Sequence, residues 1–151
     1  MINKRLLLCD DEVHIIRPAE LKLTKAGFDV QCAHDGEEGW AAILKRPPDL
    51  LITDCQMPRL DGFGLCRRVR DNPETRHIAI LMLTAKGFEL SHEEVKRRFQ
   101  VLAVLPKPFS PRQLVRLATI ICTTGTLEGV SIEGHEGTAD GLELLATAMR
   151  W

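Results

Sequence analysis

DLLITDCQMPRLDGFG, residues 49–64, joins a short apolar run to a carboxylate and then to a loop that contains proline and glycine. Residues 50–52 are too few for a helix, and such a run is typical of a buried strand. We therefore expect Asp54 at the carboxyl end of a strand, followed by a turn. Ligands bind at that edge of open parallel sheets, but Asp is also an ordinary turn residue, so this stretch alone leaves the role of Asp54 open.

Length and composition favour a single domain. The chain has 151 residues, 44% of them hydrophobic, and a formal net charge of -1. This charge does not suggest a nucleic-acid binder, and no apolar run approaches the roughly 20 residues of a membrane span. The five cysteines and five histidines show neither disulfide nor zinc spacing. We expect a cytoplasmic protein without nucleic-acid or membrane partners, whose cysteines are small buried hydrophobes.

Strand and helix patterns alternate along residues 5–122. The helix starts carry capping signals: Asp35 before Glu38, Ser91 before Glu94, and Ser110 before Pro111. Pro18 lies inside the first helical pattern, where it should cost a hydrogen bond or bend the helix unless it falls in the first turn. Alternation of short apolar strands with helices predicts a parallel sheet covered on both faces. The expected strands are residues 5–9, 29–33, 50–54, 78–83 and 101–105.

The composition changes at about Thr123. Five of the eleven glycines fall between positions 125 and 141, and residues 123–151 carry five acids against one arginine. The charge of this segment is -4, which leaves +3 for residues 1–122 and gives -1 for the whole chain. We predict a domain over residues 1–122 and a Gly-rich acidic tail over 123–151. The tail is expected to be flexible, with a short C-terminal helix around Leu142 or a linker as the alternatives.

Four of the expected strands bring polar side chains to one edge of the sheet. Asp10 and Asp11 follow the first strand, Asp54 ends the third, Thr84 follows the fourth and Lys107 follows the fifth. Carboxylates brought together need a cation, and oxygen ligands suit Mg²⁺. A lysine and a hydroxyl suit phosphoryl oxygens. Each residue alone has an ordinary explanation as a helix cap or surface charge, but together they suggest phosphoryl transfer onto Asp54.

These residues resemble the receiver domain of two-component response regulators. The matching motifs are LCDDE at 8–12, Asp54 with MP at 57–58 and DG at 61–62, LTA at 83–85, and LPKPF at 105–109. The resemblance covers roughly residues 4–122. It implies an α/β, flavodoxin-like fold, a doubly wound five-stranded parallel sheet of order 2-1-3-4-5 with five helices.

The same resemblance implies a signalling module that catalyses only its own phosphorylation and dephosphorylation. Asp54 would accept the phosphoryl group from a histidine kinase or a histidine phosphotransfer protein. Asp11, Asp54 and the backbone carbonyl of Gln56 would ligate Mg²⁺, and Asp10 would act through water. The output protein is unknown, and a homodimer is left open.

The resemblance also implies roles for three residues beside the acceptor. Lys107 would pair with the phosphoryl group, and Thr84 would move toward it and report the modification. The peptide bond between Lys107 and Pro108 is usually cis in this family.

Three features depart from the family pattern. Val104 stands where receivers usually carry the aromatic residue that swings inward with the threonine. Residues 99–103 replace a small and acidic run, which predicts a more apolar face beside the last strand. Gln56 and Lys86 occupy positions that tune how long the phosphoryl group survives, and we expect a lifetime unlike that of fast-cycling chemotaxis members.

Several alternatives remain open. A stand-alone receiver is the main hypothesis, and a receiver fragment of a larger regulator or hybrid kinase is its close variant. A haloacid dehalogenase-like phosphatase would also form an aspartyl phosphate, but it needs an acid at the position of Gln56. A degenerate receiver that serves only as a scaffold would lack acceptor-site residues, and this sequence keeps them.

Overall fold

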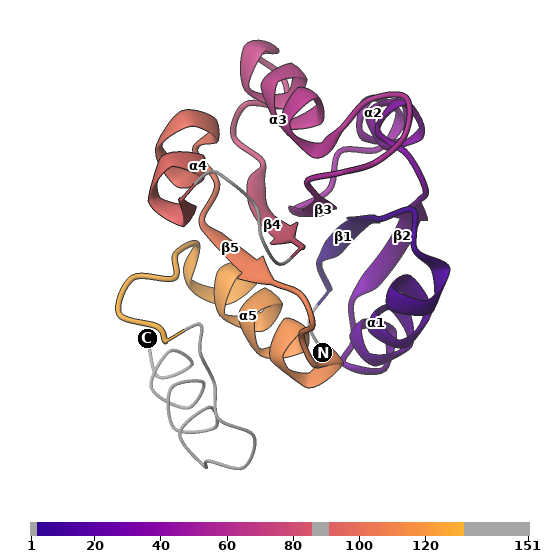
Figure 1. Ribbon diagram of the computed structural model, residues 1–151. Coiled ribbons are helices and arrows are strands. Elements are labelled where there is room, and N and C mark those ends of the chain that lie inside the picture. The colour runs from indigo at the N-terminus through magenta and orange to yellow at the C-terminus, as the bar shows by residue number, and fades with distance from the viewer. Residues whose placement is uncertain (1–2, 86–90, 132–151) are drawn as a thin grey trace.

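A single parallel sheet forms the centre of the molecule (Figure 1). The computed structural model describes residues 3–85 and 91–131. Its strands lie in the order β2-β1-β3-β4-β5, and every neighbouring pair is parallel. The predicted doubly wound sheet of order 2-1-3-4-5 is therefore confirmed. The strands are β1 (Arg5–Cys9), β2 (Asp29–Ala33), β3 (Leu50–Asp54), β4 (Ala79–Thr84) and β5 (Ala103–Pro106).

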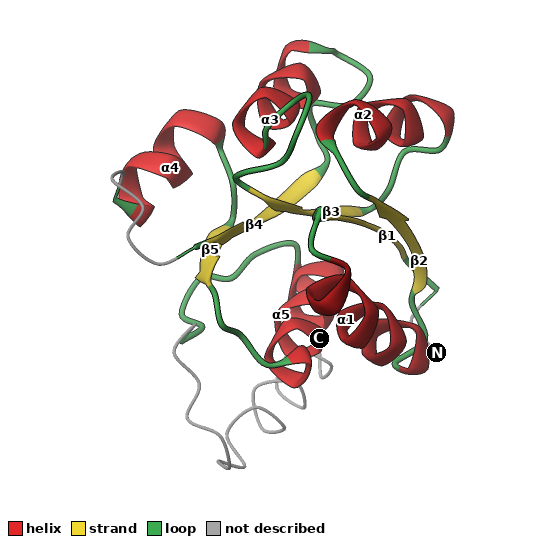
Figure 2. Cartoon of the chain, turned by 45° about the vertical axis from the view of Figure 1, so that its right-hand side comes forward, coloured by secondary structure: helices red, strands yellow, loops and turns green. Residues whose placement is uncertain are grey.

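Five helices cover the two faces of the sheet. Helices α1 and α5 lie against one face, and α2, α3 and α4 lie against the other (Figure 2). This arrangement follows from the strict alternation of strands with helices, because each parallel crossover must pass over one face. The helices are α1 (Val13–Lys25), α2 (Gly36–Lys45), α3 (Gly62–Asp71), α4 (His92–Phe99) and α5 (Pro111–Thr124).

The strands supply both hydrophobic cores. Successive side chains of a strand point to opposite faces, so an uninterrupted apolar strand can serve two cores. Leu6 and Leu8 pack with α1 and α5, whereas Leu7 packs with α2 and α3. Strand β3 divides in the same way, with Ile52 on the first side and Leu51 on the second. This two-sided burial fixes the register that delivers Asp54 to the edge of the sheet.

The predicted helix caps are present. The side chain of Asp35 accepts a hydrogen bond from the backbone N–H of Glu38 at 2.8 Å. Ser91 and Ser110 accept equivalent bonds, at 3.2 Å and 3.0 Å, from the N–H groups three residues later. Asp61, which the sequence analysis did not single out as a cap, does the same for helix α3 at 2.8 Å.

Pro18 lies inside helix α1, beyond the first turn. Because proline has no N–H, the helix loses the bond that this residue would donate to the carbonyl of His14. The helix nevertheless continues to Lys25, held by the burial of Ile16, Ala19 and Leu23.

Two predicted strand boundaries are wrong by one or two residues. The expected strand 78–83 is observed at 79–84, because the N–H of Ile78 donates to Thr75 in the preceding turn. The expected strand 101–105 begins at Ala103, because Gln100 adopts a left-handed conformation with φ 54° where α4 ends. Val101 and Leu102 connect Gln100 to the first residue of β5.

The chain stays packed beyond residue 122. Helix α5 runs to Thr124, and Gly125 closes it with φ 78°. Leu127 is 9% exposed and packs against the core beneath α1 and α5. The domain boundary at 122 stays a prediction, and the helix expected around Leu142 lies outside the described residues. Over residues 3–85 and 91–131, no helix is long and apolar enough to cross a membrane.

Candidate functional site

The carboxyl ends of the strands gather the polar residues that the sequence places there. Asp54 is the last residue of β3 and Thr84 the last of β4, while Asp10 and Lys107 follow β1 and β5 directly. The N–H of Asp10 donates to the carbonyl of Ala33 at 3.1 Å, and the N–H of Lys107 donates to that of Thr84 at 2.7 Å. These bonds continue the sheet past its last paired residues and fix both side chains at this edge.

Three carboxylates surround the ammonium group of Lys107. Its Nζ lies 2.8 Å from Asp10 Oδ2, 3.2 Å from Glu12 Oε1 and 3.2 Å from Asp54 Oδ2. The side chains of Asp10 and Asp54 are 0% and 6% exposed, and that of Lys107 is 11% exposed. One cation therefore faces three anions, of which Asp10 and Asp54 are withdrawn from water and Glu12 is 43% exposed.

The protonation of Asp54 reflects this excess of negative charge. Burial and the neighbouring charge of Asp10 raise the pKa of Asp54 from 3.8 to about 6, and Lys107 only partly opposes the shift. Burial lowers the pKa of Lys107, but the pairing with Asp10, Asp54 and Glu12 outweighs it and moves the pKa above the ordinary range. Lys107 is thus a permanent cation, and Asp54 is a carboxylate that would gain from a second positive charge.

Backbone hydrogen bonds fix the conformation of the loop after Asp54. The N–H of Cys55 donates to the carbonyl of Leu83 at 3.0 Å, and its Sγ lies 3.0 Å from the same oxygen. Burial raises the pKa of Cys55 to about 12, so its thiol stays protonated and can donate. Gly62 donates to the carbonyl of Cys55 at 2.9 Å, and a Cβ at position 62 would collide with the carbonyl oxygen of Asp54. Glycine is therefore required there.

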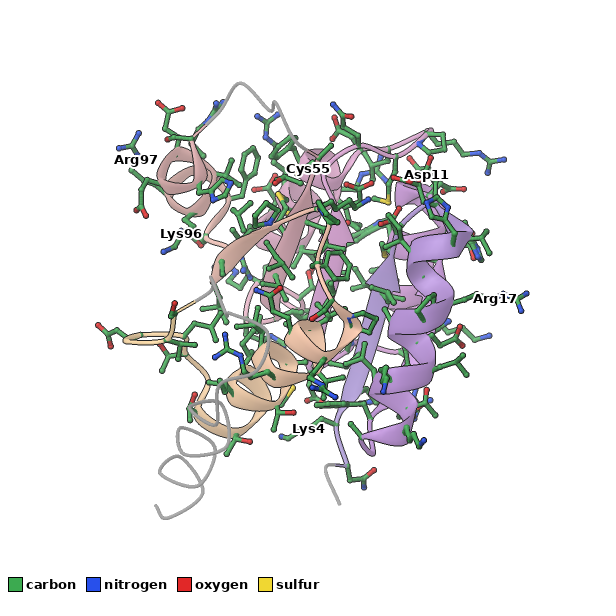
Figure 3. All side chains as sticks on the ribbon, turned by 60° about the horizontal axis from the view of Figure 1, so that its bottom comes forward. Lys4, Asp11, Arg17, Cys55, Lys96 and Arg97 are labelled. Carbon is green, nitrogen blue, oxygen red and sulfur yellow. The ribbon has the colours of Figure 1, made fainter. Side chains whose placement is uncertain are left out.

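Glu12, which the sequence analysis did not select, joins the converging carboxylates, and the role of Asp11 as a metal ligand stays a prediction. The carboxylates that converge within 4.8 Å belong to Asp10, Glu12 and Asp54. Asp11 is exposed and lines the open hollow beside them, together with Gln56 and Lys107. Figure 3 shows Asp11 and Cys55 at the same end of the molecule, opposite Lys4. The acidic run at 10–12 was the signal that could have identified Glu12.

Thr84 and the proline after Lys107 take the expected positions. Thr84 is 2% exposed and lies at the same sheet edge, one residue past the partner of Asp54 on β4. The Lys107–Pro108 peptide bond is cis, as the resemblance implied.

The donor set fits a small divalent cation. Every converging ligand atom is a carboxylate oxygen, which suits Mg²⁺. Asp10 Oδ2 is fully buried and forms an ion pair with Lys107, yet within the described residues it accepts no hydrogen bond of good geometry. A buried carboxylate oxygen of this kind can still accept from a metal-bound water.

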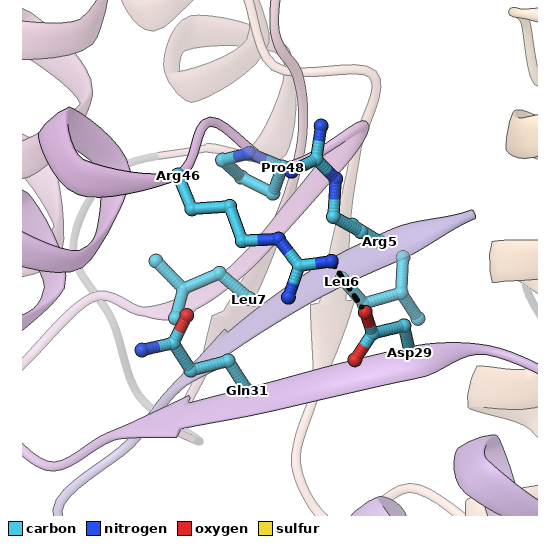
Figure 4. Close-up of a pocket in the computed structure, with 7 residues that line it drawn as sticks. All are labelled: Arg5, Leu6, Leu7, Asp29, Gln31, Arg46 and Pro48. Carbon is cyan, nitrogen blue, oxygen red and sulfur yellow. Dashed lines mark hydrogen bonds and ion pairs between the residues drawn. The ribbon is translucent and has the colours of Figure 1, made fainter.

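The opposite edge of the sheet holds a second, much smaller hollow (Figure 4). Its volume is about 10 Å³, room for about one water molecule. Arg46 closes it by pairing with Asp29 at 2.9 Å, and both side chains are more than half exposed. Nothing in this hollow combines burial with unbalanced charge, so we place the functional site at the carboxyl edge.

Val104 and its neighbours fill the core. Val104 is 1% exposed and packs on the side of the sheet covered by α2, α3 and α4. Phe99 and Val101 are 4% and 5% exposed in the same core. Phe99, Val101 and Ala103 are buried and do not make the surface beside β5 more apolar, whereas Leu102 is partly exposed there. Lys86 lies outside the described residues.

Comparison with known proteins identifies similar sequences and folds. Residues 6–119 match the family described as the response regulator receiver domain. The chain is 37% identical over 131 residues to the phosphate regulon transcriptional regulatory protein PhoB of Pseudomonas aeruginosa, a match that covers 83% of this chain and 55% of PhoB. It is 31% identical over 149 residues to the alkaline phosphatase synthesis transcriptional regulatory protein PhoP of Bacillus subtilis, covering 89% and 58%. The chain thus spans about half the length of these curated relatives.

Solved structures repeat the fold over most of their length. A chain from Chloroflexus aurantiacus assigned as a response regulator is 39% identical, with a TM-score of 0.72, and the match covers 80% of this chain and 98% of that one. The chemotaxis response regulator CheY4 of Vibrio cholerae is 30% identical, with a TM-score of 0.69 and coverage of 77% and 96%. The family match is to receivers.

Proposed function

The chain belongs to the response regulator receiver domain family of two-component signalling, and from this membership we propose that Asp54 is its phosphoacceptor. The phosphoryl donor would be a phosphohistidine on a histidine kinase or a histidine phosphotransfer protein. The observation that carries the proposal is the position of Asp54, a strand-end carboxylate with its Oδ2 3.2 Å from Lys107 Nζ. The family consists of signalling modules and not of enzymes that turn over an external substrate.

The proposed reaction is a displacement at phosphorus. An oxygen of the Asp54 carboxylate forms the new P–O bond, and the P–N bond to the donor imidazole breaks, so that the imidazole leaves with the bonding electrons. Lys107 offers a permanent positive charge to the phosphoryl oxygens, and the hydroxyl of Thr84 can donate to one of them. Attack requires the ionised carboxylate, and a pKa of about 6 leaves Asp54 mostly ionised at neutral pH.

Asp10, Asp11, Asp54 and the backbone carbonyl of Gln56 are the proposed Mg²⁺ ligands, with Asp10 acting through water. The ion would neutralise charge on the phosphoryl group. Support comes from the three converging carboxylates and from Asp10 Oδ2, which lacks a hydrogen bond within the described residues. Glu12, which pairs with Lys107 at 3.2 Å, would help to hold that lysine in place.

The phosphorylated chain would signal through binding of an output protein, and hydrolysis of the acyl phosphate by the domain itself would end the signal. PhoB and PhoP are named as transcriptional regulatory proteins, and whether this chain works alone or as part of a longer regulator stays open. A cytoplasmic location, a homodimer and the absence of a nucleic-acid partner stay predictions. So does an unusual phosphoryl lifetime, which replacement of Gln56 should change.

The test is the intact mass of the 151-residue protein after incubation with a small phosphodonor such as acetyl phosphate. We expect a gain of one phosphoryl mass that requires Mg²⁺ and is absent from Asp54→Asn. Asp29→Asn is the matched control, because it removes a carboxylate from the opposite edge of the sheet.

A mass gain that persists in Asp54→Asn would move the acceptor to another residue. No gain in any variant, with the protein folded and Mg²⁺ bound, would contradict the proposal and favour the degenerate scaffold.

A further inference from the structure

The arginines of α3 and α4 differ in whether they have a partner. Arg68 on α3 forms two hydrogen bonds of 3.0 Å to the carboxylate of Glu37. Arg67 and Arg98, in contrast, make no ion pair with any described residue. Both residues are exposed, so these two positive charges lie at the surface without a carboxylate partner among the described residues.

The two unpaired arginines converge on one aromatic ring. The guanidinium carbon of Arg67 lies 5.5 Å from the ring centre of Phe99, and that of Arg98 lies 5.7 Å from it. The two charges cannot be farther apart than the sum of these distances, which is about one Debye length at 0.1 M salt. Each guanidinium group is attracted to the face of the ring. Like charges held this close repel, and an anion bound beside them would relieve the repulsion.

Contacts between α3 and the end of α4 hold the two helices together beneath these arginines. The ring of Phe63 packs against that of Phe99 with their centres 4.8 Å apart, which ties the start of α3 to the end of α4. Arg70 donates to the carbonyls of Arg76 and Ile78 at 2.6 and 2.7 Å. It also donates to carbonyls at the end of α4, namely Phe99 at 3.4 Å and Gln100 at 2.8 Å. The two helices therefore present their arginines in a fixed arrangement.

Two more cations extend the surface. Lys96 and Arg97 point away from the body on α4 (Figure 3) and form no ion pair within the described residues. We call Arg67, Lys96, Arg97 and Arg98 the α3–α4 cationic surface. Its three arginines are exposed and Lys96 is partly exposed, whereas residues 132–151 carry four acids and a single arginine.

We propose that the α3–α4 cationic surface binds the acidic carboxylates of the chain's own segment 132–151. The acids are Glu133, Glu136, Asp140 and Glu143. Ser131, the last described residue, accepts a hydrogen bond from Arg116 on α5, and α5 and α4 flank the edge strand β5 from opposite faces (Figure 2).

The length of the chain permits such a contact. The nine residues from 132 to 140 span at most about 30 Å when extended, roughly the diameter of a small domain.

The test is cleavage of the full 151-residue protein by a protease specific for glutamate, at about 0.1 M salt, followed by intact mass. The double variant Arg67→Gln/Arg98→Gln leaves every cleavage site in the tail unchanged. We expect cleavage after residues 133, 136 and 143 to be about three- to tenfold faster in this variant than in the parent, the effect of losing a few exposed ion pairs.

The matched control removes two exposed cations from α1, Arg17→Gln/Lys22→Gln, and should leave the cleavage rate unchanged. If the first double variant loses its circular dichroism signal, Arg98→Gln alone replaces it, because Arg98 is exposed in the last turn of α4. Equal cleavage rates in the parent and the folded α3–α4 variant would overturn the proposal. So would an equal acceleration in the α1 control, which would show a general effect of net charge.

Discussion

The two ends of the parallel sheet hold similar residue types in opposite electrostatic situations. At the amino edge, Arg46 and Asp29 form a one-to-one pair 2.9 Å apart that is more than half exposed. At the carboxyl edge, Lys107 meets Asp10, Glu12 and Asp54 within 3.2 Å, and the pair it forms with Asp10 is nearly fully buried. Matched, solvated charge needs no function to explain it. Buried and unbalanced charge is costly, and it supports our proposal that a cation and a phosphoryl group bind at this edge.

The sharpest contrast should come from removing the cation at each edge. Lys107→Met leaves three carboxylates without their counter-charge, and we expect it to lower the free energy of unfolding by about 3 kcal/mol at neutral pH. Arg46→Gln at the amino edge should cost about 0.5 kcal/mol or less, because its pair is exposed. Urea unfolding of both variants measures the difference. Equal losses would show that the two edges do not differ as described.

Removing one anion from the carboxyl edge should have the opposite sign. Because the pKa of Asp54 is raised to about 6 from 3.8, the folded protein holds this proton more tightly than the unfolded chain. Ionised Asp54 therefore destabilises the fold at neutral pH, and this cost fades as the pH falls from 6 toward 4. Asp54→Asn should stabilise the protein by about 2 kcal/mol at pH 7.5 and by little at pH 4.

The control for this prediction is Asp29→Asn, which should show no gain at either pH. Thermal or urea unfolding at the two pH values gives the comparison. If Asp54→Asn raises the free energy of unfolding equally at both pH values, the negative charge of Asp54 is not what destabilises the fold.

Mg²⁺ should stabilise only the carboxyl edge. A cation that binds the folded state alone adds about 1.4 kcal/mol at ten times its dissociation constant. We expect the melting temperature of the parent and of Asp29→Asn to rise with Mg²⁺, and the rise to be lost in Asp10→Asn and Asp54→Asn. A response that survives in both carboxyl-edge variants would place the ion elsewhere.

Much of this contrast could be read from the sequence. Short apolar strands that end on Asp10, Asp54, Thr84 and Lys107 predict a parallel sheet and a common edge, because all carboxyl ends of such a sheet lie together. The caps at Asp35, Ser91 and Ser110 could also be predicted, since their bonds are local in sequence, whereas the cap at Asp61 was not predicted. The strand boundaries near Ile78 and Val101 were not, because a turn and a left-handed residue decide them.

The missing parts of the site depend on side-chain packing. Glu12 follows Asp10 and Asp11 in one acidic run, and only the three-dimensional path of the chain shows which of the three carboxylates reach Lys107. Arg67 and Arg98, which converge on Phe99, lie 31 positions apart in the sequence and on two different helices, so no local pattern predicts their contact.

The central claim, that Asp54 is the acceptor, is tested most directly by locating the phosphoryl group. Borohydride reduction of the phosphorylated protein converts an acyl phosphate to a stable alcohol, which marks the modified residue through trypsin digestion and mass spectrometry. Residues 46–59 form one tryptic peptide that contains Asp54, and residues 6–22 form another that contains Asp10 and Asp11. We predict the mark at Asp54 in the first peptide. A mark in the second peptide would contradict the assignment of the acceptor.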